Sequence, residues 1–456
     1  MTKGKIWFAL GVLFAINFLN FYDRLIIGAV GESIALDWGL SDSQLGYLGT
    51  AFVLVYAAVG VPLGRWSDRG NRSHILTIGV TIWSILTAMS GMAQNFVQMV
   101  ALRLSVGVGE AACAPASNSL IGDLFPAATR ARAMSIFMLG LPLGNAGALL
   151  ISGILTKHYG WQYAFYIALI PGLLCALGAF MIHEPKRGGT ELHNIGAAKR
   201  AGSPYALVFS IPTMRWIIVS GALHNFNMYA IGGFLAPLVI RVHGLDPQSA
   251  GWVTMAVYGL AGVPGMMLGG LMGDAILRRR RNGRMLLAAW AIAFAVPLMY
   301  FALAQPAGQW VLFSILFGLG CMMMYVYYAT VYSTIQDVIE PSLRATAMAL
   351  YFAAMYVFGG ALGPTVIGKT SDYFASQAAA TAGVDLTTLD AAGKLQYRAY
   401  GLNTALYALP VVSLFLAGSL FAGSRTVNRD VDNLQRWMRE HSAANPPPLK
   451  KEEVVT

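Results

Sequence analysis

Two stretches of the chain carry the same pattern: Asp123-Leu-Phe-Pro-Ala-Ala-Thr-Arg130-Ala-Arg-Ala133-Met134 and Asp337-Val-Ile-Glu-Pro-Ser-Leu-Arg344-Ala-Thr-Ala347-Met348. The Asp, Arg, Ala and Met positions match at an offset of 214 residues. A second pair lies upstream of each stretch, where Gly64-Arg-Trp-Ser-Asp68 corresponds to Gly270-Leu-Met-Gly-Asp274 at an offset of 206 residues. These matches indicate that the chain consists of two copies of one structural unit.

The composition shows what kind of unit is repeated. Of the 456 residues, 56% are hydrophobic and only 11% are charged, whereas an ordinary soluble domain has about 25% charged residues. A soluble enzyme is therefore excluded, and a membrane protein with many spans is expected. The three cysteines are far apart in apolar runs, so we expect no disulfide framework and no metal site. No motif supports an enzyme or a cofactor.

Apolar runs long enough to cross a bilayer recur along the whole chain. We predict twelve membrane helices, at residues 6–31, 43–64, 73–93, 96–120, 133–156, 163–182, 214–240, 248–273, 285–304, 309–333, 343–368 and 399–421. The predicted fold class is an all-α integral membrane protein with two pseudo-symmetric six-helix bundles, residues 1–182 and 214–421.

Two polar segments complete the predicted domain organisation. Residues 183–213 form a linker between the bundles, and residues 422–456 form a tail. In the tail, Val427, Val431, Leu434 and Trp437 recur at helical spacing, which is typical of an amphipathic helix on a membrane surface. A tail without this role is the alternative.

The distribution of basic residues predicts the topology. The two ends of the chain and the connections on their side of the membrane hold 24 Lys and Arg residues, against five in the opposite connections, which are Lys157, Arg241, Lys369, Lys394 and Arg398. Because basic connections stay in the cytoplasm, we expect both termini to be cytoplasmic. The formal net charge of +10 then reflects contact with anionic lipid and not with nucleic acid.

Four ionisable residues lie deep inside the predicted spans: Asp23, Arg24, Arg103 and Glu110. Burying each one costs roughly 2.5–3.5 kcal/mol even on lenient scales, so such residues persist where they face a polar cavity and pair. At 1.5 Å of rise per residue, Asp23 and Arg103 come to similar depths and are plausible partners.

Glu110 lies two turns deeper than Arg103 on the same helix face, with Arg24 as its candidate cation. We predict that Glu110 and Asp23 carry the coupling proton, and that Arg24 and Arg103 hold an anionic group or neutralise the empty site. A fixed ion-pair network that only locks helices one and four together is the alternative.

Several motifs resemble the major facilitator superfamily, and within it the Spinster family. They are Asn20-Phe-Tyr-Asp23-Arg24, Asp68-Arg69-Gly70-Asn71-Arg72, Arg103-x6-Glu110-Ala, and the run from Arg132 through Gly140-Leu-Pro142-Leu-Gly144-Asn145. The resemblance covers nearly the whole chain and implies a bacterial, Spinster-like transporter of the inner membrane that works by alternating access. In the Spinster family the residues matching Asp23 and Glu110 are assigned to proton coupling. Anion:cation symporters share a similar Asp-Arg pair and Glu, and are the nearest rivals.

In this superfamily spans one, four, seven and ten line the central cavity. The resemblance therefore implies cavity-lining positions at Asn17, Asn20, His224, Asn227, Tyr325 and Tyr328. Such a cavity is charged on one wall and aromatic with Met on the other, which suits an amphipathic anion. The family resemblance suggests a lysolipid or a sphingoid-type lipid. Ordinary helix packing is the alternative for His224 and for the Tyr and Met residues.

A second charged group is predicted on the cytoplasmic side. Asp68, Arg69, Arg72, Arg130 and Arg132 lie in its connections, where a carboxylate among arginines would latch the two bundles together. Charge that only sets the topology is the alternative.

The predicted partners are protons, the bilayer and a small-molecule or lipid substrate, and the protein is expected to function as a monomer. A small organic anion:proton symporter and a membrane sensor that does not transport are the alternatives in function.

Overall fold

The computed structural model describes residues 2–125, 133–134, 136–185, 203–340, 343–386 and 388–443. Among these residues, twelve helical segments are long and apolar enough to cross a membrane, and the regular secondary structure is helical throughout. The predicted all-α membrane fold is confirmed.

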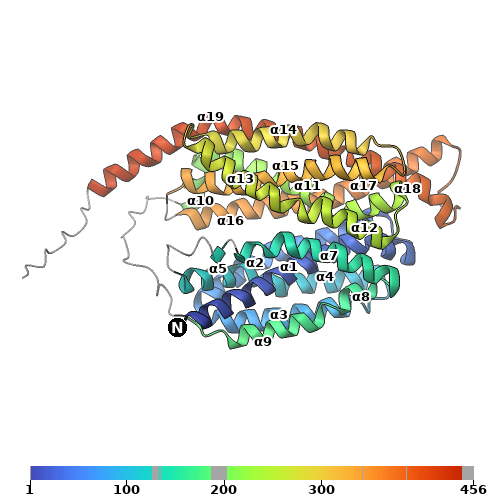
Figure 1. Cartoon of the computed structure of the whole chain (residues 1–456), viewed down its shortest axis with the longest axis horizontal. Coiled ribbons are helices and arrows are strands. Elements are labelled where there is room, and N and C mark those ends of the chain that lie inside the picture. Colours follow the sequence, from blue (N-terminus) through green and yellow to red (C-terminus); the bar gives the residue numbers. More distant parts are fainter. Residues whose placement is uncertain are drawn as a thin grey trace, which may run out of the picture.

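The first six spans form one bundle, coloured blue to green in Figure 1. They are α1 (Lys3–Trp38), α2 (Asp42–Arg69), α3 (Arg72–Ser90), α4 with α5 (Phe96–Glu110 and Cys113–Leu124), α7 (Gly140–His158), and α8 with α9 (Gln162–Tyr166 and Leu169–Met181).

The second bundle lies against the first as a separate layer (Figure 1). It follows a short helix, α10 (Pro204–Ser210), that lies inside the predicted linker. Its spans are α11 (Pro212–His243); α12, η1 and α13 (Pro247–Thr254, Met255–Leu260 and Gly262–Leu277); α14 (Gly283–Leu303); α15 (Trp310–Val338); α16, η3 and α17 (Arg344–Ala354, Met355–Gly360 and Leu362–Thr381); and α18 with α19 (Ala391–Leu406 and Ala408–Ala443).

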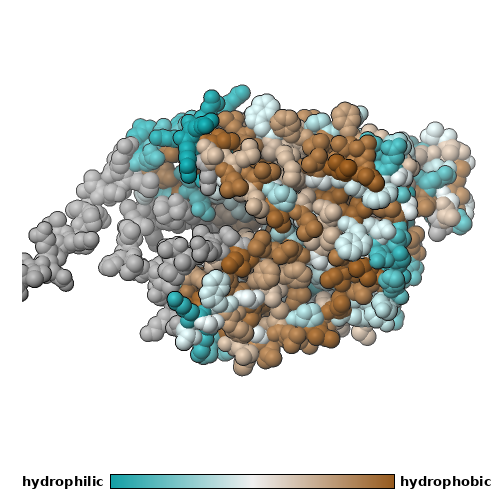
Figure 2. Space-filling view, in the orientation of Figure 1, coloured by the Kyte–Doolittle hydropathy of each residue, from teal (hydrophilic) through white to brown (hydrophobic). Residues whose placement is uncertain are grey.

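The helices run along the long axis of the molecule, so the protein has two distinct ends. We call the end where α1 begins and α19 ends the terminal end, and the opposite end, with α12 and α18, the distal end (Figure 1). In Figure 2 apolar side chains cover the middle of the visible face and hydrophilic ones gather toward the two ends. This band is what a bilayer requires of the surface of a spanning protein.

The repeat seen in the sequence reappears as one ion pair in each bundle. At the terminal end, Arg72 lies 2.5 Å from Asp123, and Arg284 lies 2.7 Å from Asp337. Asp123 and Asp337 are the matched aspartates of the two copies. The two bundles therefore share a local structure as well as a local sequence.

Two spans of the second bundle contain a π-helical segment at the same relative position. The segments are η1 and η3, and a proline follows each one four residues after its end, Pro264 and Pro364. Proline has no N–H for the carbonyl four residues earlier, and π-turns often accompany functional sites. In η3 the side chain of Asn225 donates a hydrogen bond to the Met355 carbonyl at 2.9 Å, so this wider turn is held from α11.

The helices extend beyond the apolar runs that predicted them, because backbone hydrogen bonding continues past the first polar residues. The clearest case is α19, whose last turns continue through residue 443 into the predicted tail. There Val427 and Leu434 are 1% and 8% exposed, so the apolar stripe packs on protein. The prediction that this stripe rests on a membrane surface is wrong for these two residues.

Candidate functional site

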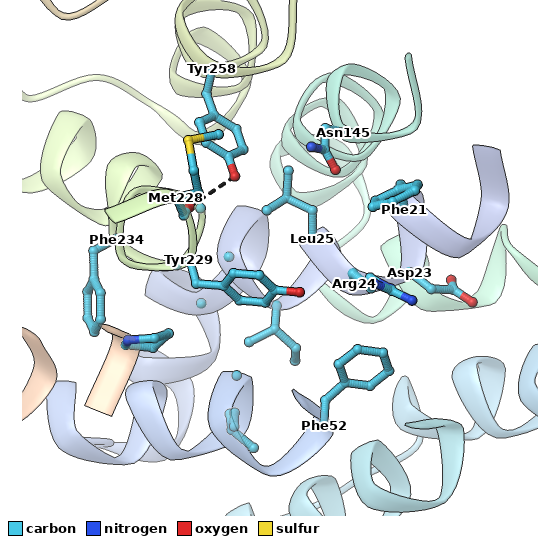
Figure 3. A pocket seen from close by; sticks show the side chains of 18 of the residues that line it. Phe21, Asp23, Arg24, Leu25, Phe52, Asn145, Met228, Tyr229, Phe234 and Tyr258 are labelled. Atoms are coloured by element: carbon cyan, nitrogen blue, oxygen red, sulfur yellow. Dashed lines mark hydrogen bonds between the residues drawn. The ribbon is translucent and has the colours of Figure 1, made fainter. Parts of the chain in front are cut away.

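A cavity of about 110 Å³ lies between the two bundles, roughly halfway along the helices. Figure 3 shows its wall, with Arg24 from α1 opposite Tyr229 from α11, and with Tyr258 from η1 beside Met228. Asp23 also lines the cavity, and its carboxyl group points away from Tyr229 in this view. Arg103 from α4 completes the charged side. The cavity is therefore lined by both copies of the repeat, and its charged residues come from the first copy.

Glu110 is the last residue of α4, where the span turns into α5. Its side chain is fully buried. One carboxylate oxygen, Oε2, accepts a hydrogen bond from Asn20 Nδ2 at 2.9 Å and another from Arg24 Nε at 3.2 Å. The other oxygen, Oε1, has no hydrogen-bond partner among the described residues. That oxygen is free to take a proton without breaking either bond.

Asp23 is held one turn closer to the distal end. Its Oδ2 accepts a hydrogen bond from Thr87 Oγ1 at 3.0 Å, while its Oδ1 lacks a partner within the described part of the chain. Arg103 binds the backbone of Asp23: Nη1 donates to the Asp23 carbonyl at 3.4 Å. Its Nη2 donates to Ser90 Oγ at 2.9 Å. Arg103 and Asp23 are therefore neighbours linked through α3.

Arg24 is enclosed by aromatic rings. Its guanidinium carbon lies 4.2 Å from the centre of the Tyr56 ring, 5.1 Å from Phe21 and 5.5 Å from Phe52. Stacking a cation on aromatic faces is favourable, and more so where water is absent. The Tyr229 hydroxyl of the second bundle points toward the same guanidinium (Figure 3). Arg24 thus binds the carboxylate of Glu110 in the first bundle and faces the Tyr229 hydroxyl of the second bundle.

The wall supplied by the second bundle is apolar and aromatic. Met228, Tyr229 and Phe234 come from α11, Tyr258 from η1, and Tyr325 and Tyr328 from α15. The Tyr258 hydroxyl donates to the Met228 carbonyl at 3.0 Å (Figure 3). One side of the cavity is thus charged, and the other is apolar apart from the hydroxyl groups of its tyrosines.

Four predicted cavity residues are not among those that line the cavity. Asn17 donates to the Phe137 carbonyl, Asn20 to Glu110, and Asn227 to the Leu409 carbonyl and Ser413. His224 is fully buried and its ring stacks on Tyr327 at 4.0 Å. The three asparagines use their side-chain amides to hold helices together, and His224 packs through its ring. The assignment of these four residues to the cavity wall is therefore corrected, while Tyr325 and Tyr328 do line it.

One residue of the predicted gate at the terminal end is held within the first bundle. Arg72 is 1% exposed and binds Asp123, Ser119 and Glu184, all within the first bundle. In this structure Arg72 therefore holds the first bundle together, and a latch between the two bundles stays a prediction. Arg130 and Arg132 lie outside the described residues, as do the side chains of Asp68 and Arg69.

The distal end carries a buried ion network that the sequence analysis missed. Arg241 of α11 binds Asp42 with two hydrogen bonds of 2.8 Å and Glu32 with one of 2.6 Å. Arg398 of α18 donates to the same Asp42 at 3.0 Å. Asp372 of α17 accepts hydrogen bonds from the backbone N–H groups of Asp42 and Ser43. Each of these contacts joins one bundle to the other and closes the distal end.

A further cross-bundle ion pair lies at the exposed rim of the distal end. Lys157 is 3.1 Å from Asp246, and both side chains are more than 40% exposed. The Ser249 hydroxyl donates to Asp246, and together with Lys157 it lowers the pKa of that carboxyl to about 2. Three of the five basic residues that were used only to predict topology thus form ion pairs between the bundles. A search for acidic residues near the same ends of the predicted spans could have identified these ion pairs from the sequence.

Comparison with known proteins agrees with this architecture. Residues 13–364 match the model of the Major Facilitator Superfamily. An MFS-type efflux pump of Mycolicibacterium smegmatis is 28% identical over 375 residues, covering 81% of this chain and 85% of that protein. Human protein spinster homolog 1 is 27% identical over 392 residues, covering 82% of this chain and 74% of that protein.

A solved structure gives the same result in three dimensions. It is a bacterial homologue of the human lysosomal transporter Spinster, described as inward-facing and unoccupied. The TM-score is 0.84 at 27% identity, over 94% of this chain and 99% of that one. The family and these relatives are transporters and not enzymes, which agrees with the function class expected from the composition.

Proposed function

The chain belongs to the major facilitator superfamily and is a Spinster-like membrane transporter, and we propose that it couples protons to the movement of an amphipathic anion. The observation that carries this proposal is a group of four charges buried in the first bundle: Asp23, Arg24 and Arg103 line a cavity shared by both bundles, and Glu110 lies behind them and binds Arg24. The second bundle faces them with an aromatic and methionine surface.

The charge balance supports proton coupling. With both carboxyl groups ionised, Asp23 and Glu110 neutralise Arg24 and Arg103. One proton on Glu110 leaves a net positive charge beside the cavity, where low dielectric makes the attraction for an anion strong. Loss of the proton restores neutrality and favours release. The free Oε1 of Glu110 and the free Oδ1 of Asp23 offer a place for such protons.

The shape of the cavity wall supports the substrate class. An anionic head group placed near Arg24 and Arg103 leaves its apolar part against Met228, Phe234 and Tyr258. Methionine and aromatic side chains adapt to flexible apolar groups. A lysolipid or sphingoid-type lipid with a negative head has both properties. A small organic anion would use only the charged side.

The closed distal end supports a transport cycle of alternating access. Arg241, Asp42 and Glu32 hold the bundles together there, while the cavity lies deeper in the protein. With both termini in the cytoplasm of a bacterium, as the basic residues indicate, this form faces inward. We propose that a monomer in the inner membrane alternates between this form and one open at the distal end.

Reconstitution into liposomes with a pH gradient tests the proposal. Wild-type protein should move long-chain lysolipids when the gradient is applied, and Glu110→Gln should reduce this transport to background while substrate exchange without a gradient persists. Glu184→Gln is the matched control, because it neutralises a glutamate that is also paired with an arginine but lies away from the cavity. That control should keep gradient-driven transport.

Other outcomes would redirect the assignment. Gradient-driven transport that survives Glu110→Gln contradicts the coupling role. Movement of short organic acids but not of lysolipids selects the organic anion symporter. Binding of panel members without any movement selects a membrane sensor.

A further inference from the structure

We infer that Tyr229 is the residue through which the second bundle responds to the protonation of Glu110, with Arg24 as the link and Tyr356 holding Tyr229 in place. This inference rests on the proposed function and deepens it. The proposed function assigns the proton to the first bundle, but alternating access requires the other bundle to respond. A contact between the two bundles must therefore transmit the change in the charge of Glu110.

Arg24 is the group shared by both sides. Its Nε lies 3.2 Å from Glu110 Oε2 within the first bundle. Its side chain then extends into the cavity, where the Tyr229 hydroxyl of α11 points toward it (Figure 3). A tyrosine hydroxyl can accept a hydrogen bond from a guanidinium. Arg24 therefore binds a carboxylate of the first bundle and faces a hydroxyl group of the second.

Aromatic packing holds Tyr229 in this position. The ring of Tyr356, from the π-helical segment η3, meets Tyr229 edge to face at 6.4 Å and Tyr56 at 5.4 Å. Tyr56 in turn lies beneath the guanidinium at 4.2 Å. The three tyrosines come from α2, α11 and η3, so they form a continuous path around Arg24 that crosses the interface between the bundles.

Protonation of Glu110 changes the relative strength of the contacts that Arg24 makes with the two bundles. A neutral carboxyl group attracts the guanidinium less than a carboxylate does, because the attraction between opposite charges is lost. The guanidinium then depends more on the Tyr229 hydroxyl and on the aromatic faces. Because these contacts exist with the distal end closed, protonation stabilises the closed distal form.

Other titratable or charged groups also face this pair from the elements packed around it. They are Asp23 of α1, Tyr56 of α2, Arg103 of α4, Cys113 of α5, Tyr229 of α11 and Tyr356 of η3. Asp23 is the one that competes with Glu110 as a proton acceptor. The experiment therefore includes a background with Asp23→Asn.

A distance between the bundles at the distal end provides the readout. Tyr159 of the first bundle and Tyr373 of α17 are 66% and 59% exposed there. Spin labels on Tyr159→Cys and Tyr373→Cys, in the full-length protein with Cys175→Ser, report the closed and open populations. Between pH 8 and pH 5 the wild-type background should shift toward the shorter distance, and Glu110→Gln should stay at the acidic distribution.

Tyr229→Phe should reduce the pH-dependent change in the population ratio by about tenfold, which corresponds to one hydrogen bond to a charged group. Tyr229→Leu, which also removes the ring, should abolish it. The effect should persist with Asp23→Asn. The control is Tyr351→Phe, which removes a buried hydroxyl of the same bundle that is bonded to Tyr327, and it should shift like the wild type.

Two results would overturn the inference. Either the Tyr229 variants shift with pH as the wild type does, or the wild type shows no pH-dependent shift. If only the Tyr229 variants behave normally while Glu110→Gln loses both the shift and gradient-driven transport, the inference fails and the proposed function stands.

Discussion

The molecule contains two buried charge clusters built from the same residue types, one at the cavity and one at the distal end. In the distal cluster Arg241 binds Asp42 through two hydrogen bonds and Glu32 through a third, across the two bundles. In the central cluster Glu110 and Asp23 each keep one oxygen without a partner among the described residues. The comparison teaches that satisfied charges hold a conformation, whereas partly satisfied charges beside a cavity can exchange protons and ligands.

The largest expected effect comes from breaking the distal cluster. Arg241→Gln leaves Glu32 and Asp42 buried without their main partner, and removing one side of a buried ion pair costs about 3–5 kcal/mol. That cost falls on the closed distal form, because opening returns the carboxylates to water. The distal distance between spin labels should move to the open population, and transport should fall.

Arg241→Lys is the control for this change, since it keeps the charge but loses the planar fork. It should restore part of the closed population. A distal end that stays closed in Arg241→Gln would contradict the comparison, because the cluster would then be dispensable.

A smaller effect is expected from Arg103→Lys in the central cluster. Lysine keeps the charge but cannot reach the Asp23 carbonyl, Thr87 and Ser90 together as the guanidinium does. The loss of about one hydrogen bond to a charged group, roughly 1.5–3 kcal/mol, should weaken substrate binding by at least tenfold.

The measurement for Arg103→Lys is the substrate concentration at half-maximal transport, alongside the distal distance. The distance distribution should remain that of the wild type, since the partners of Arg103 among the described residues all belong to the first bundle. A change in distance with unaltered substrate binding would show that Arg103 helps to close the distal end. The two clusters would then not differ in function.

The smallest effect is expected at the exposed rim. Lys157→Ala removes an ion pair with Asp246 whose side chains are both about two-fifths exposed, and such pairs contribute less than about 1 kcal/mol. The pKa of Asp246 is lowered to about 2, so any stability from this carboxyl is present above its ordinary pKa and is lost as the pH falls toward 2.

Between pH 5 and pH 8 the pH profile of transport should therefore be the same for Lys157→Ala and the wild type. An altered profile in this range would show that rim charges, and not the central carboxyl groups, set the pH response. Thermal unfolding at pH 7 should change only slightly.

The sequence predicted the twelve spans, the repeat and the four central charges, because these depend on local properties. Apolar length reports a span, and a charge inside such a length is rare enough to stand out. The same reasoning missed Tyr229 and Tyr56, because tyrosines are frequent in this chain and nothing local distinguishes those that face an arginine. It also placed Asn227 and His224 on the cavity wall, because it could name the helix but not the face.

By itself, then, the sequence determined that the protein is a two-fold repeat of membrane helices and that the four charges deep inside the predicted spans lie in helices one and four. Only the tertiary structure decided which charges hold the bundles together and which remain available. Arg241 and Asp42 are 199 residues apart and Arg24 and Glu110 are 86 apart. Each pair forms because helix packing sets the rotation and depth of the helices, and neither quantity can be derived from the apolar pattern of one span.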